Sequence, residues 1–453
     1  MVFQLHIGVL AFPFGTHAAP LLNLVQRLAA ASAPGVKFSF LNTSSSNKEI
    51  FPERVLGTND NIRAYDVWDG MPNDRIFSAT HFEAMELFLN AAPANFEKVI
   101  EEAEMESGSR ICCLLTDAFL WFGSDLAEKR GVPWVPFWTA ASCSLSAHWY
   151  TDLIQDELES NGASIEQTLS FIPGMSMVNF THLPPEIFYS KNVTPLSLTI
   201  YKMVKNLPKS TAVVLNSFEE IDPIITKDLK SKFQHFLNIG PSILSSPIPH
   251  SPKDNYQNEC LSWLERQNMP KSVVYISFGT VISPPENELV SFAEALEASK
   301  FPFLWSLKDK AMKLLPGGFL ERTSEFGKVV SWAPQLQILA HNCVGVFVTH
   351  CGWNSVLESI SNGVPMICRP FFGDQKLNGK MVEDAWKIGV TVKGGVFTKN
   401  ETIEALNCIM SSEEIRENVT KLKDKAIKAV ELEGSSTKNF STLLEIITNA
   451  KAT

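Results

Sequence analysis

The chain has 453 residues, of which 45% are hydrophobic and 19% are charged, and its formal net charge at pH 7 is −10. This composition is that of a globular rather than a disordered protein, and the length predicts two domains because a single core stops growing at roughly 250–300 residues. The acidic balance argues against nucleic acid as a partner, since phosphate backbones are bound by clustered Lys and Arg.

The N-terminal stretch MVFQLHIGVLAFPFG is apolar but lacks the basic start of a signal peptide, so we interpret it as a first strand. No apolar run reaches the ~18 residues that a membrane span requires. We therefore expect a cytoplasmic protein without a membrane span. The eight cysteines form no CxxC pair and have no partner histidines at zinc spacing, which argues against a metal site or a disulfide framework.

Short apolar runs alternate with helical spacing through the first half of the chain. Residues 5–11 predict a buried strand, a turn with Gly15 and His17 follows, and residues 20–31 show helical spacing. Further strands are predicted at residues 36–41, 111–115, 134–138 and 212–216, with a helix through residue 129. The alternation indicates an α/β fold with a parallel sheet covered on both faces.

Polar residues stand directly after three of these predicted strands. In parallel α/β folds the ligand crevice lies beyond the carboxyl ends of the strands. His17, Asp117 and Thr139 each follow a strand end, so we expect all three to line one crevice.

A segment rich in Pro and Ser, residues 241–255, interrupts the pattern and indicates a linker. Beyond it, strands are predicted at residues 272–278, 301–307, 328–332 and 344–349, with a helix at 286–298 and a last helix at about 436–449. We therefore divide the chain into a first domain (1–240), a linker (241–257), a second domain (258–433) and a C-terminal segment (434–453).

Residues 332–375 carry the most informative pattern in the chain. The apolar run 344–348 is followed by His350, Gly352, Asn354 and Ser355 and then by helical spacing through residue 360. A strand that leads through a small polar turn into a helix is an anion site, because unpaired N–H groups and the positive end of the helix dipole face the ligand. The three polar side chains add donors, and the glycine lets the backbone come close.

Rival nucleotide-binding and catalytic motifs are missing from the sequence. There is no GxGxxG for a dinucleotide-dependent oxidoreductase and no GxSxG nucleophile elbow. The segment GDQKLNGK at 373–380 is similar to a phosphate-binding loop but has five residues between its glycines and no Ser or Thr after Lys.

Residues 332–375 resemble the sugar-nucleotide signature of plant family 1 UDP-dependent glycosyltransferases in length and at nearly every fixed position. The whole chain is most similar to the flavonoid and anthocyanidin 3-O-glucosyltransferases of that family. The resemblance implies two facing Rossmann-like domains of the GT-B type, the first binding the acceptor and the second the UDP-sugar, with a C-terminal helix that returns to the first domain. It implies UDP-glucose as a co-substrate, no cofactor, a small phenolic acceptor and a monomer.

The resemblance also implies the role of each residue in the donor site. Trp332 stacks on uracil, Glu358 accepts hydrogen bonds from the ribose, and Asp374 and Gln375 bind the sugar, which suits the chemistry of an aromatic face, a carboxylate and an amide. Taken singly, Glu358 would be a solvated helix residue and Trp332 a core aromatic. The implied donor-binding residues are Gly15, Thr139, Ser277, Thr280, Ser306, Trp332, Ala333, Gln335, His350, Gly352, Trp353, Asn354, Ser355, Glu358, Asp374 and Gln375.

His17 is the candidate general base that takes the proton of the acceptor hydroxyl. A histidine, with its usual pKa of about 6.5, suits a phenolic or enolic hydroxyl, and the family's base stands at this place. A surface-loop histidine is the alternative. Asp117 would accept from the far ring nitrogen and stabilise the imidazolium. By itself Asp117 could equally cap its helix, and the resemblance favours the catalytic role.

The leaving diphosphate would be stabilised by the helix that starts near Trp353, by His350 and by the hydroxyls of Ser277 and Thr280. The sequence has no Asp-x-Asp motif for a Mg²⁺–diphosphate site, so a metal-independent enzyme is predicted. A single in-line displacement would convert an α-linked donor into a β-glycoside.

The acceptor pocket is expected in the first domain, where aromatic residues surround the strand ends. His148 resembles a residue that hydrogen-bonds the flavonoid in close relatives, and a structural histidine is the alternative. The implied acceptor-binding residues are His17, Phe14, Phe119, His148, Phe372 and Gly373.

Gln375 predicts glucose as the transferred sugar, because in the family Gln at this place goes with UDP-glucose and His often with UDP-galactose. Two other functions stay open: transfer to another small phenolic or a terpenoid, and a non-catalytic sugar-nucleotide binder, which would need neither His17 nor Asp117.

Overall fold

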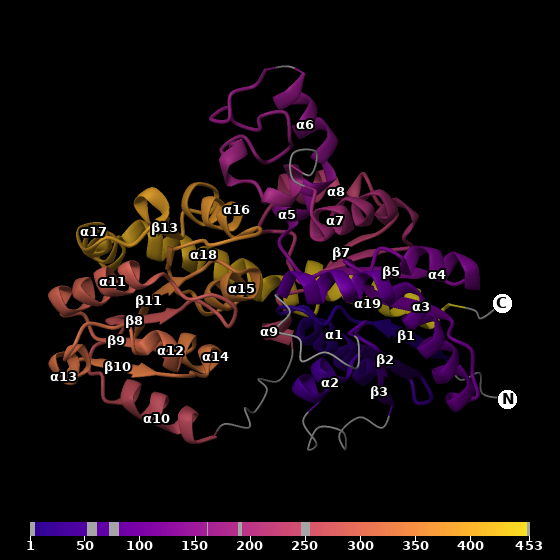
Figure 1. Ribbon diagram of the computed structural model, residues 1–453, viewed down its shortest axis with the longest axis horizontal. Helices are drawn as coiled ribbons and strands as arrows, with labels where there is room; N and C mark the ends of the chain where they lie inside the picture. The colour runs from indigo at the N-terminus through magenta and orange to yellow at the C-terminus, as the bar shows by residue number, and fades with distance from the viewer. Residues whose placement is uncertain are drawn as a thin grey trace.

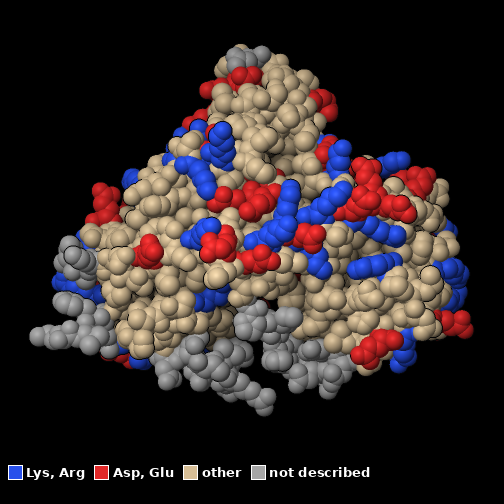
Figure 2. All heavy atoms as spheres, turned by 180° about the vertical axis from the view of Figure 1, so that it is seen from behind, with Lys and Arg blue, Asp and Glu red and all other residues tan. Residues whose placement is uncertain are grey.

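The computed structural model describes residues 5–51, 61–71, 81–160, 162–188, 193–245 and 254–450. They form two α/β domains side by side, each built on a parallel sheet with helices on both faces (Figure 1). The expected α/β class with two facing domains is confirmed. Lys and Arg are interspersed with Asp and Glu across the middle of the back face (Figure 2).

The first sheet has the strand order β3-β2-β1-β4-β5-β6-β7, and every pairing is parallel. Its central strands are buried on both faces, which is why they read as continuous apolar runs. Chain order reverses between β1 and β4, and ligands bind at such switch points. The strands are β1 (His6–Leu10), β2 (Lys37–Thr43), β3 (Ile62–Val67), β4 (Cys113–Asp117), β5 (Trp134–Trp138), β6 (Val213–Leu215) and β7 (Phe236–Asn238).

The second sheet repeats this topology in the order β10-β9-β8-β11-β12-β13, with its switch point between β8 and β11. Part of its apolar surface packs in a cluster confined to the second domain, whereas another part belongs to a core cluster that continues into the first domain. The strands are β8 (Val273–Ser277), β9 (Phe303–Ser306), β10 (Gly327–Val330), β11 (Val344–Thr349), β12 (Met366–Cys368) and β13 (Gly389–Thr391).

The helices of the first domain surround its sheet or, like the sixth of them, project away from it (Figure 1). They are α1 (Ala18–Ala31), α2 (Ser44–Ile50), α3 (His81–Ser107), α4 (Gly123–Arg130), α5 (Ser142–Trp149), α6 (Thr151–Glu159), α7 (Pro195–Asn206) and α8 (Pro223–Lys230), with the short turns η1 (Phe180–His182), η2 (Pro185–Phe188) and η3 (Leu207–Lys209). The second domain has α10 (Asp254–Glu265), α11 (Glu286–Ser299), α12 (Asp309–Met312), α13 (Phe319–Thr323), α14 (Gln335–Leu339), α15 (Trp353–Asn362), α16 (Gln375–Lys380), η4 (Met381–Ala385), η5 (Lys393–Gly395), α17 (Lys399–Ser411) and α18 (Glu413–Val430).

The last helix, α19 (Ser435–Thr448), crosses back to the first domain. Leu443 and Ile447 are buried in the core of that domain. Ser436 Oγ donates to Gly240 O at 2.6 Å, and Asn439 Nδ2 donates to Asn238 O at 2.9 Å. The returning C-terminal helix is confirmed.

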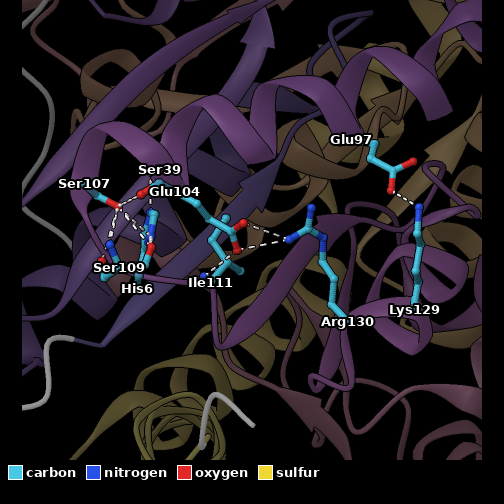
Figure 3. A network of polar contacts seen from close by, with 9 residues as sticks. All are labelled: His6, Ser39, Glu97, Glu104, Ser107, Ser109, Ile111, Lys129 and Arg130. Atoms are coloured by element: carbon cyan, nitrogen blue, oxygen red, sulfur yellow. Dashed lines mark hydrogen bonds and ion pairs between the residues drawn. The ribbon is translucent and has the colours of Figure 1, made fainter.

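A polar network fixes the end of the first sheet that lies away from its switch point (Figure 3). His6 Nδ1 lies 2.8 Å from Ser109 O and Nε2 lies 2.7 Å from Ser39 Oγ. A carbonyl only accepts, so Nδ1 carries the proton and Nε2 accepts from the hydroxyl. Burial lowers the pKa of His6, which favours this neutral form. Beside it, Arg130 Nη1 donates to both oxygens of Glu104 at 3.0 and 3.1 Å.

The elements that the sequence pattern did not predict include the helix α3 and the strands β3, β7, β12 and β13. It also ends β10 at Val330, so Trp332 lies beyond the strand rather than in it. Within the predicted linker, residues 246–253 lie outside the described residues, α9 (Ser242–Ser245) forms at one end and α10 begins at the other. The exact domain boundaries stay predictions.

All eight cysteines lie in the described ranges and are free, and seven of them are buried. Among the described helices, none has both the length and the apolar character needed to span a membrane.

Candidate active site

His17 lies at the switch point of the first sheet, at the N-cap of α1. Gly15 two residues earlier has φ +62°, a conformation that glycine adopts without strain, and this turns the chain from β1 into the helix. His17 Nδ1 lies 2.9 Å from Asp117 Oδ2 and 3.1 Å from Thr139 Oγ1. The carboxylate holds the proton on Nδ1 and leaves Nε2 with a free lone pair.

Asp117 ends β4 and is 1% exposed. Its second oxygen, Oδ1, accepts from Phe119 N at 2.9 Å, which closes the turn after the strand. The N-cap of α4 is Phe122, so the interpretation of Asp117 as a helix cap is wrong. One oxygen of Asp117 therefore shapes the turn and the other faces His17.

Aromatic rings enclose His17 on two sides. The His17 ring centroid is 5.1 Å from that of Phe12 and 4.6 Å from that of Phe119. Phe14 packs 5.3 Å from Phe12, and Phe119 packs 5.9 Å from Trp138. Phe12 and Trp138 are buried core residues, whereas Phe14 and Phe119 are half-buried and complete an apolar wall beside the imidazole.

His148, on α5, is 4% exposed and packs edge-on against Trp138 with centroids 5.9 Å apart. Burial lowers the pKa of His148 to about 4, so the ring is neutral at physiological pH. This environment fits a structural histidine, and its contact with an acceptor stays a prediction.

Three hydroxyl residues end neighbouring strands of the second sheet in register. Ser277 pairs with Ser306 on one side and with Thr349 on the other. Thr280 follows three residues after β8 and is exposed, and its carbonyl accepts from Lys308 Nζ. The predicted hydroxyl donors thus share one edge of the sheet.

The turn after β11 holds His350 in a narrow slot. Added Cβ atoms at Gly279 and Gly352 would come within 2.9 Å and 2.5 Å of the His350 ring, so both positions require glycine. Cys351, which follows His350, has φ +64°, a strained conformation for a residue with a side chain. His350 Nδ1 is buried without a hydrogen-bond partner, and burial lowers the pKa of the ring to about 4. An orphaned polar atom beside the start of α15 suits a ligand that brings acceptors.

Across the interdomain seam this turn meets the loop that carries His17. Asn354 Nδ2 donates to Thr16 Oγ1 at 3.4 Å. The predicted anion site and the predicted base therefore lie on facing loops of the two domains, although they are far apart in the sequence.

Gln335, Ser355 and Glu358 form one cluster on α14 and α15. Gln335 Nε2 donates to Glu358 Oε2 at 2.6 Å and to Ser355 Oγ at 3.0 Å, and Gln335 Oε1 accepts from Tyr275 at 3.3 Å. Desolvation by the surrounding protein raises the pKa of Glu358 to about 7. The interpretation of Glu358 as a solvated helix residue is wrong. Half-buried Trp332 and buried Ala333 directly precede α14.

Asp374 and Gln375 begin α16. Asp374 Oδ2 accepts from Asn378 Nδ2 at 3.0 Å, and burial raises the pKa of Asp374, partly offset by this bond and by His17 across the seam. Gln375 Oε1 accepts from Phe371 N at 2.9 Å and from Phe372 N at 3.2 Å. Because these two N–H groups occupy Oε1, the amide nitrogen of Gln375 is the group left for a sugar.

The loop before α16 is partly exposed. Phe372 is 45% exposed, and Gly373 has φ +59°.

Two indoles connect the domains. Trp353 Nε1 donates to Asn216 O at 2.8 Å, and Trp386 Nε1 donates to Asp222 Oδ1 at 2.9 Å. The Trp353 side chain is thus turned to the first domain, and only its backbone stands at the start of α15. Sequence reasoning missed Asn216, Asp222 and Trp386. Asn216 follows the end of β6, the same signal that singled out Asp117.

The arrangement places an imidazole paired with a carboxylate, an anion slot at a helix N-terminus and polar side chains suited to hydroxyls near the contact between the two domains. No cluster of three or more His, Cys, Asp or Glu side chains suited to a metal occurs in the described ranges. A sequence model of the family described as "UDP-glucoronosyl and UDP-glucosyl transferase" matches residues 56–432. The chain belongs to this family.

Relatives and a solved structure of this glycosyltransferase family match along almost the whole chain. A flavonol 3-O-glucosyltransferase of Actinidia chinensis var. chinensis is 55% identical over 99% of this chain and 98% of its own length. An anthocyanidin 3-O-galactosyltransferase of the same species is 50% identical over 98% and 97%. A crystal structure of a UDP-glucose: anthocyanidin 3-O-glucosyltransferase in complex with UDP superimposes with a TM-score of 0.93, at 43% identity, covering 99% of this chain and 100% of that one.

As a member of the family, the chain is a UDP-sugar-dependent glycosyltransferase. The resemblance inferred from residues 332–375 is confirmed, and so is the GT-B arrangement of the two domains.

Proposed function

We propose that the chain transfers glucose from UDP-glucose to a flavonol or anthocyanidin, at the 3-hydroxyl, with inversion at the anomeric carbon. One observation carries the proposal: the His17–Asp117 pair, at 2.9 Å, faces the anion slot of His350 across the interdomain seam. The names of the relatives support the acceptor class and the 3-hydroxyl.

His17 acts as the general base in this proposal. Nε2 takes the proton of the acceptor hydroxyl while the hydroxyl oxygen forms a bond to the anomeric carbon of glucose. The bond from that carbon to the diphosphate breaks on the opposite face, and UDP leaves with the electron pair. Asp117 stabilises the imidazolium that forms, and its second bond to Phe119 N keeps the carboxylate in place.

The second domain binds and activates the donor. The start of α15, the His350 ring and the Ser277 and Thr280 hydroxyls stabilise the charge that develops on the diphosphate, and this needs no metal. Neutral His350 donates one hydrogen bond, which suits its orphaned nitrogen. The remaining residues of the donor set have supporting roles: Gly15, Gly352, Asn354 and Ser355 near the phosphates, Ser306 and Thr139 near the sugar, and Ala333 and Gln335 beside the base.

Trp332 and Glu358 bind the uridine. The indole stacks on uracil, and the Glu358 carboxylate accepts hydrogen bonds from the ribose diol. Because Gln335 Nε2 donates to Glu358 Oε2, the nucleoside must displace or share that hydrogen bond.

The acceptor packs against half-buried Phe14 and Phe119 beside His17, with Phe372, Gly373 and His148 around it. A flat polyphenol suits such a wall, because aromatic rings stack and its hydroxyls reach the polar groups.

Glucose is proposed as the sugar because the Gln375 nitrogen and the Asp374 carboxylate pair with adjacent equatorial hydroxyls. Relatives named as a glucosyltransferase and as a galactosyltransferase match at 55% and 50% identity, so overall similarity does not decide the sugar. Transfer to another small phenolic or to a terpenoid is the second candidate. A non-catalytic binder would have no use for the His17–Asp117 pair.

Acceptor-dependent UDP release separates these functions. The purified protein is incubated with UDP-glucose and, in turn, a flavonol, an anthocyanidin, a simple phenol and a terpenoid alcohol, and the anomeric configuration of each product is read by NMR. We expect release with the first two and a β-linked 3-O-glucoside. Release only with the terpenoid, or with no acceptor, would overturn the proposal. A cytoplasmic location and a monomeric state stay predictions.

A further inference from the structure

A buried ion pair stands at the start of the loop that leads to Asp374 and Gln375. Arg369 follows β12 directly and is 8% exposed, with its Nε 2.8 Å from Glu288 Oε2 and its Nη2 2.6 Å from Glu288 Oε1. Glu288 is 3% exposed in the first turn of α11, and its Oε2 also accepts from Phe397 N at 2.9 Å. This two-pronged pairing satisfies both carboxylate oxygens, as a buried charge requires.

The same guanidinium fixes the loop that follows it. Its Cζ lies 4.3 Å from the centroid of the Phe371 ring, and Nη1 donates to Pro370 O. The Phe371 ring also packs edge-on against Phe278, 5.9 Å away. Arg369 thus holds both the backbone and an aromatic side chain at the beginning of the loop.

The far end of the loop is held by Gln375, which is 4% exposed. Its Oε1 accepts from Phe371 N and Phe372 N, at 2.9 and 3.2 Å. Only the oxygen of an amide can accept these two N–H groups, so the loop backbone decides which end of the Gln375 amide points away from it.

We propose that Arg369 and Glu288 are positioning residues for sugar recognition: their ion pair fixes the loop whose N–H groups orient the Gln375 amide toward the sugar. The inference rests on the proposed use of a UDP-sugar with Asp374 and Gln375 at its hydroxyls. It concerns the sugar rather than the uridine, because Trp332 and Glu358 stand on other elements of the domain.

The test compares Arg369→Lys with Arg130→Lys. Lys keeps the charge but loses the planar fork in both variants. Arg130 is a matched control, since it also pairs with one glutamate, Glu104, at the far end of the first sheet (Figure 3). In Arg369→Lys we expect kcat/KM for UDP-glucose to fall about 10- to 100-fold, as for a misplaced binding group. The preference over UDP-galactose should fall as well, while inhibition by UDP stays unchanged. In Arg130→Lys, kcat/KM for UDP-glucose, the sugar preference and inhibition by UDP should all stay as in wild type.

The inference would be overturned if Arg369→Lys weakened inhibition by UDP as much as it lowered kcat/KM for UDP-glucose. An unchanged preference for UDP-glucose over UDP-galactose would also overturn it. Phe371→Leu removes the ring next to the guanidinium but keeps the ion pair. This variant tests the inference even if Arg369→Lys does not fold. Phe371→Leu should also lower the preference for UDP-glucose over UDP-galactose, while its thermal unfolding temperature stays close to that of wild type.

Hydrogen exchange gives a readout that needs no transfer. The amides of Phe371 and Phe372 should exchange faster in Arg369→Lys than in wild type and unchanged in Arg130→Lys. Unchanged exchange in Arg369→Lys would contradict the positioning role. A wild-type protein that transfers no sugar would instead contradict the proposed function, and the exchange result would still decide whether the ion pair orders the loop.

Discussion

Gln335 Nε2 lies 2.6 Å from Glu358 Oε2, and the amide is the polar group that stabilises the charged form of that carboxyl. Desolvation outweighs this bond and raises the pKa of Glu358 to about 7. A ribose diol needs the carboxylate, because a protonated carboxyl offers one acceptor fewer.

Binding of UDP-glucose should therefore depend on pH. The pKa of Glu358 in the free protein lies above its usual value, so the binding-competent carboxylate is the minor form below pH 7 and the major form above it. We expect the Kd for UDP-glucose to be about tenfold higher at pH 6 than at pH 8, in proportion to the competent fraction. Calorimetry on wild type and Glu358→Gln measures this. Glu358→Gln should bind weakly at both pH values, and a pH dependence that persists in it would assign the effect to another group.

His17→Ala should abolish transfer while UDP-glucose binding stays nearly unchanged, because His17 stands on the first domain. Loss of general-base catalysis costs about 10²–10⁴ in rate. Asp117→Asn should lower the rate comparably, since an amide would donate to Nδ1 and hold the wrong tautomer. Single-turnover rates and donor titrations check both variants. Turnover near that of wild type at neutral pH would exclude His17 as the base.

Activity should survive EDTA. In the proposed mechanism the N–H groups at the start of α15 and a hydrogen bond from neutral His350 stabilise the leaving diphosphate without a metal. Transfer rates are compared before and after chelation and again after Mg²⁺ or Mn²⁺ is added. A transfer rate that falls on chelation and recovers with Mg²⁺ or Mn²⁺ would contradict the metal-independent mechanism.

UDP-glucose should be preferred over UDP-galactose by roughly 5- to 150-fold, because an axial hydroxyl leaves one buried partner unpaired, at about 1–3 kcal/mol. Gln375→Ala and Gln375→His should erode the preference. Gln375→Glu is the sharper variant, since it keeps an oxygen for the N–H groups of Phe371 and Phe372 but loses the donor. The readout is kcat/KM for both donors with one flavonol. Equal or better use of UDP-galactose by wild type would refute this role of Gln375.

Trp332→Ala should weaken every uridine donor alike. Stacking of a base on an aromatic ring contributes about 1–3 kcal/mol, so we expect a roughly 5- to 150-fold higher Kd for UDP, UDP-glucose and UDP-galactose. Competition binding with the three nucleotides measures it. A loss confined to one sugar would place the indole elsewhere.

The order of strands and helices around the site could be predicted because the central strands are long apolar runs that end in polar turns. The three-residue strands β12 and β13 were not predicted because so short a run carries no period, whereas the equally short β6 was predicted because its apolar run continues through Ala212. Among site residues, the neighbourhood of His17 and Asp117 follows from parallel strand ends. The orientations of the Trp353 indole and the Gln375 amide could not be predicted. The indole is oriented by the carbonyl of Asn216, which is distant in sequence, and the amide by a backbone N–H of the loop that precedes it.

Trp353 contributes its backbone to the first turn of α15 and its indole to Asn216 of the other domain. That indole hydrogen bond is shielded from water, so breaking it without replacement leaves two polar groups unsatisfied. The helix that we propose to bind the diphosphate is thereby connected to the first domain. A movement of the two domains that carries the start of α15 away from Asn216 must break this hydrogen bond, so the Trp353 indole links the relative position of the domains to the proposed phosphate site.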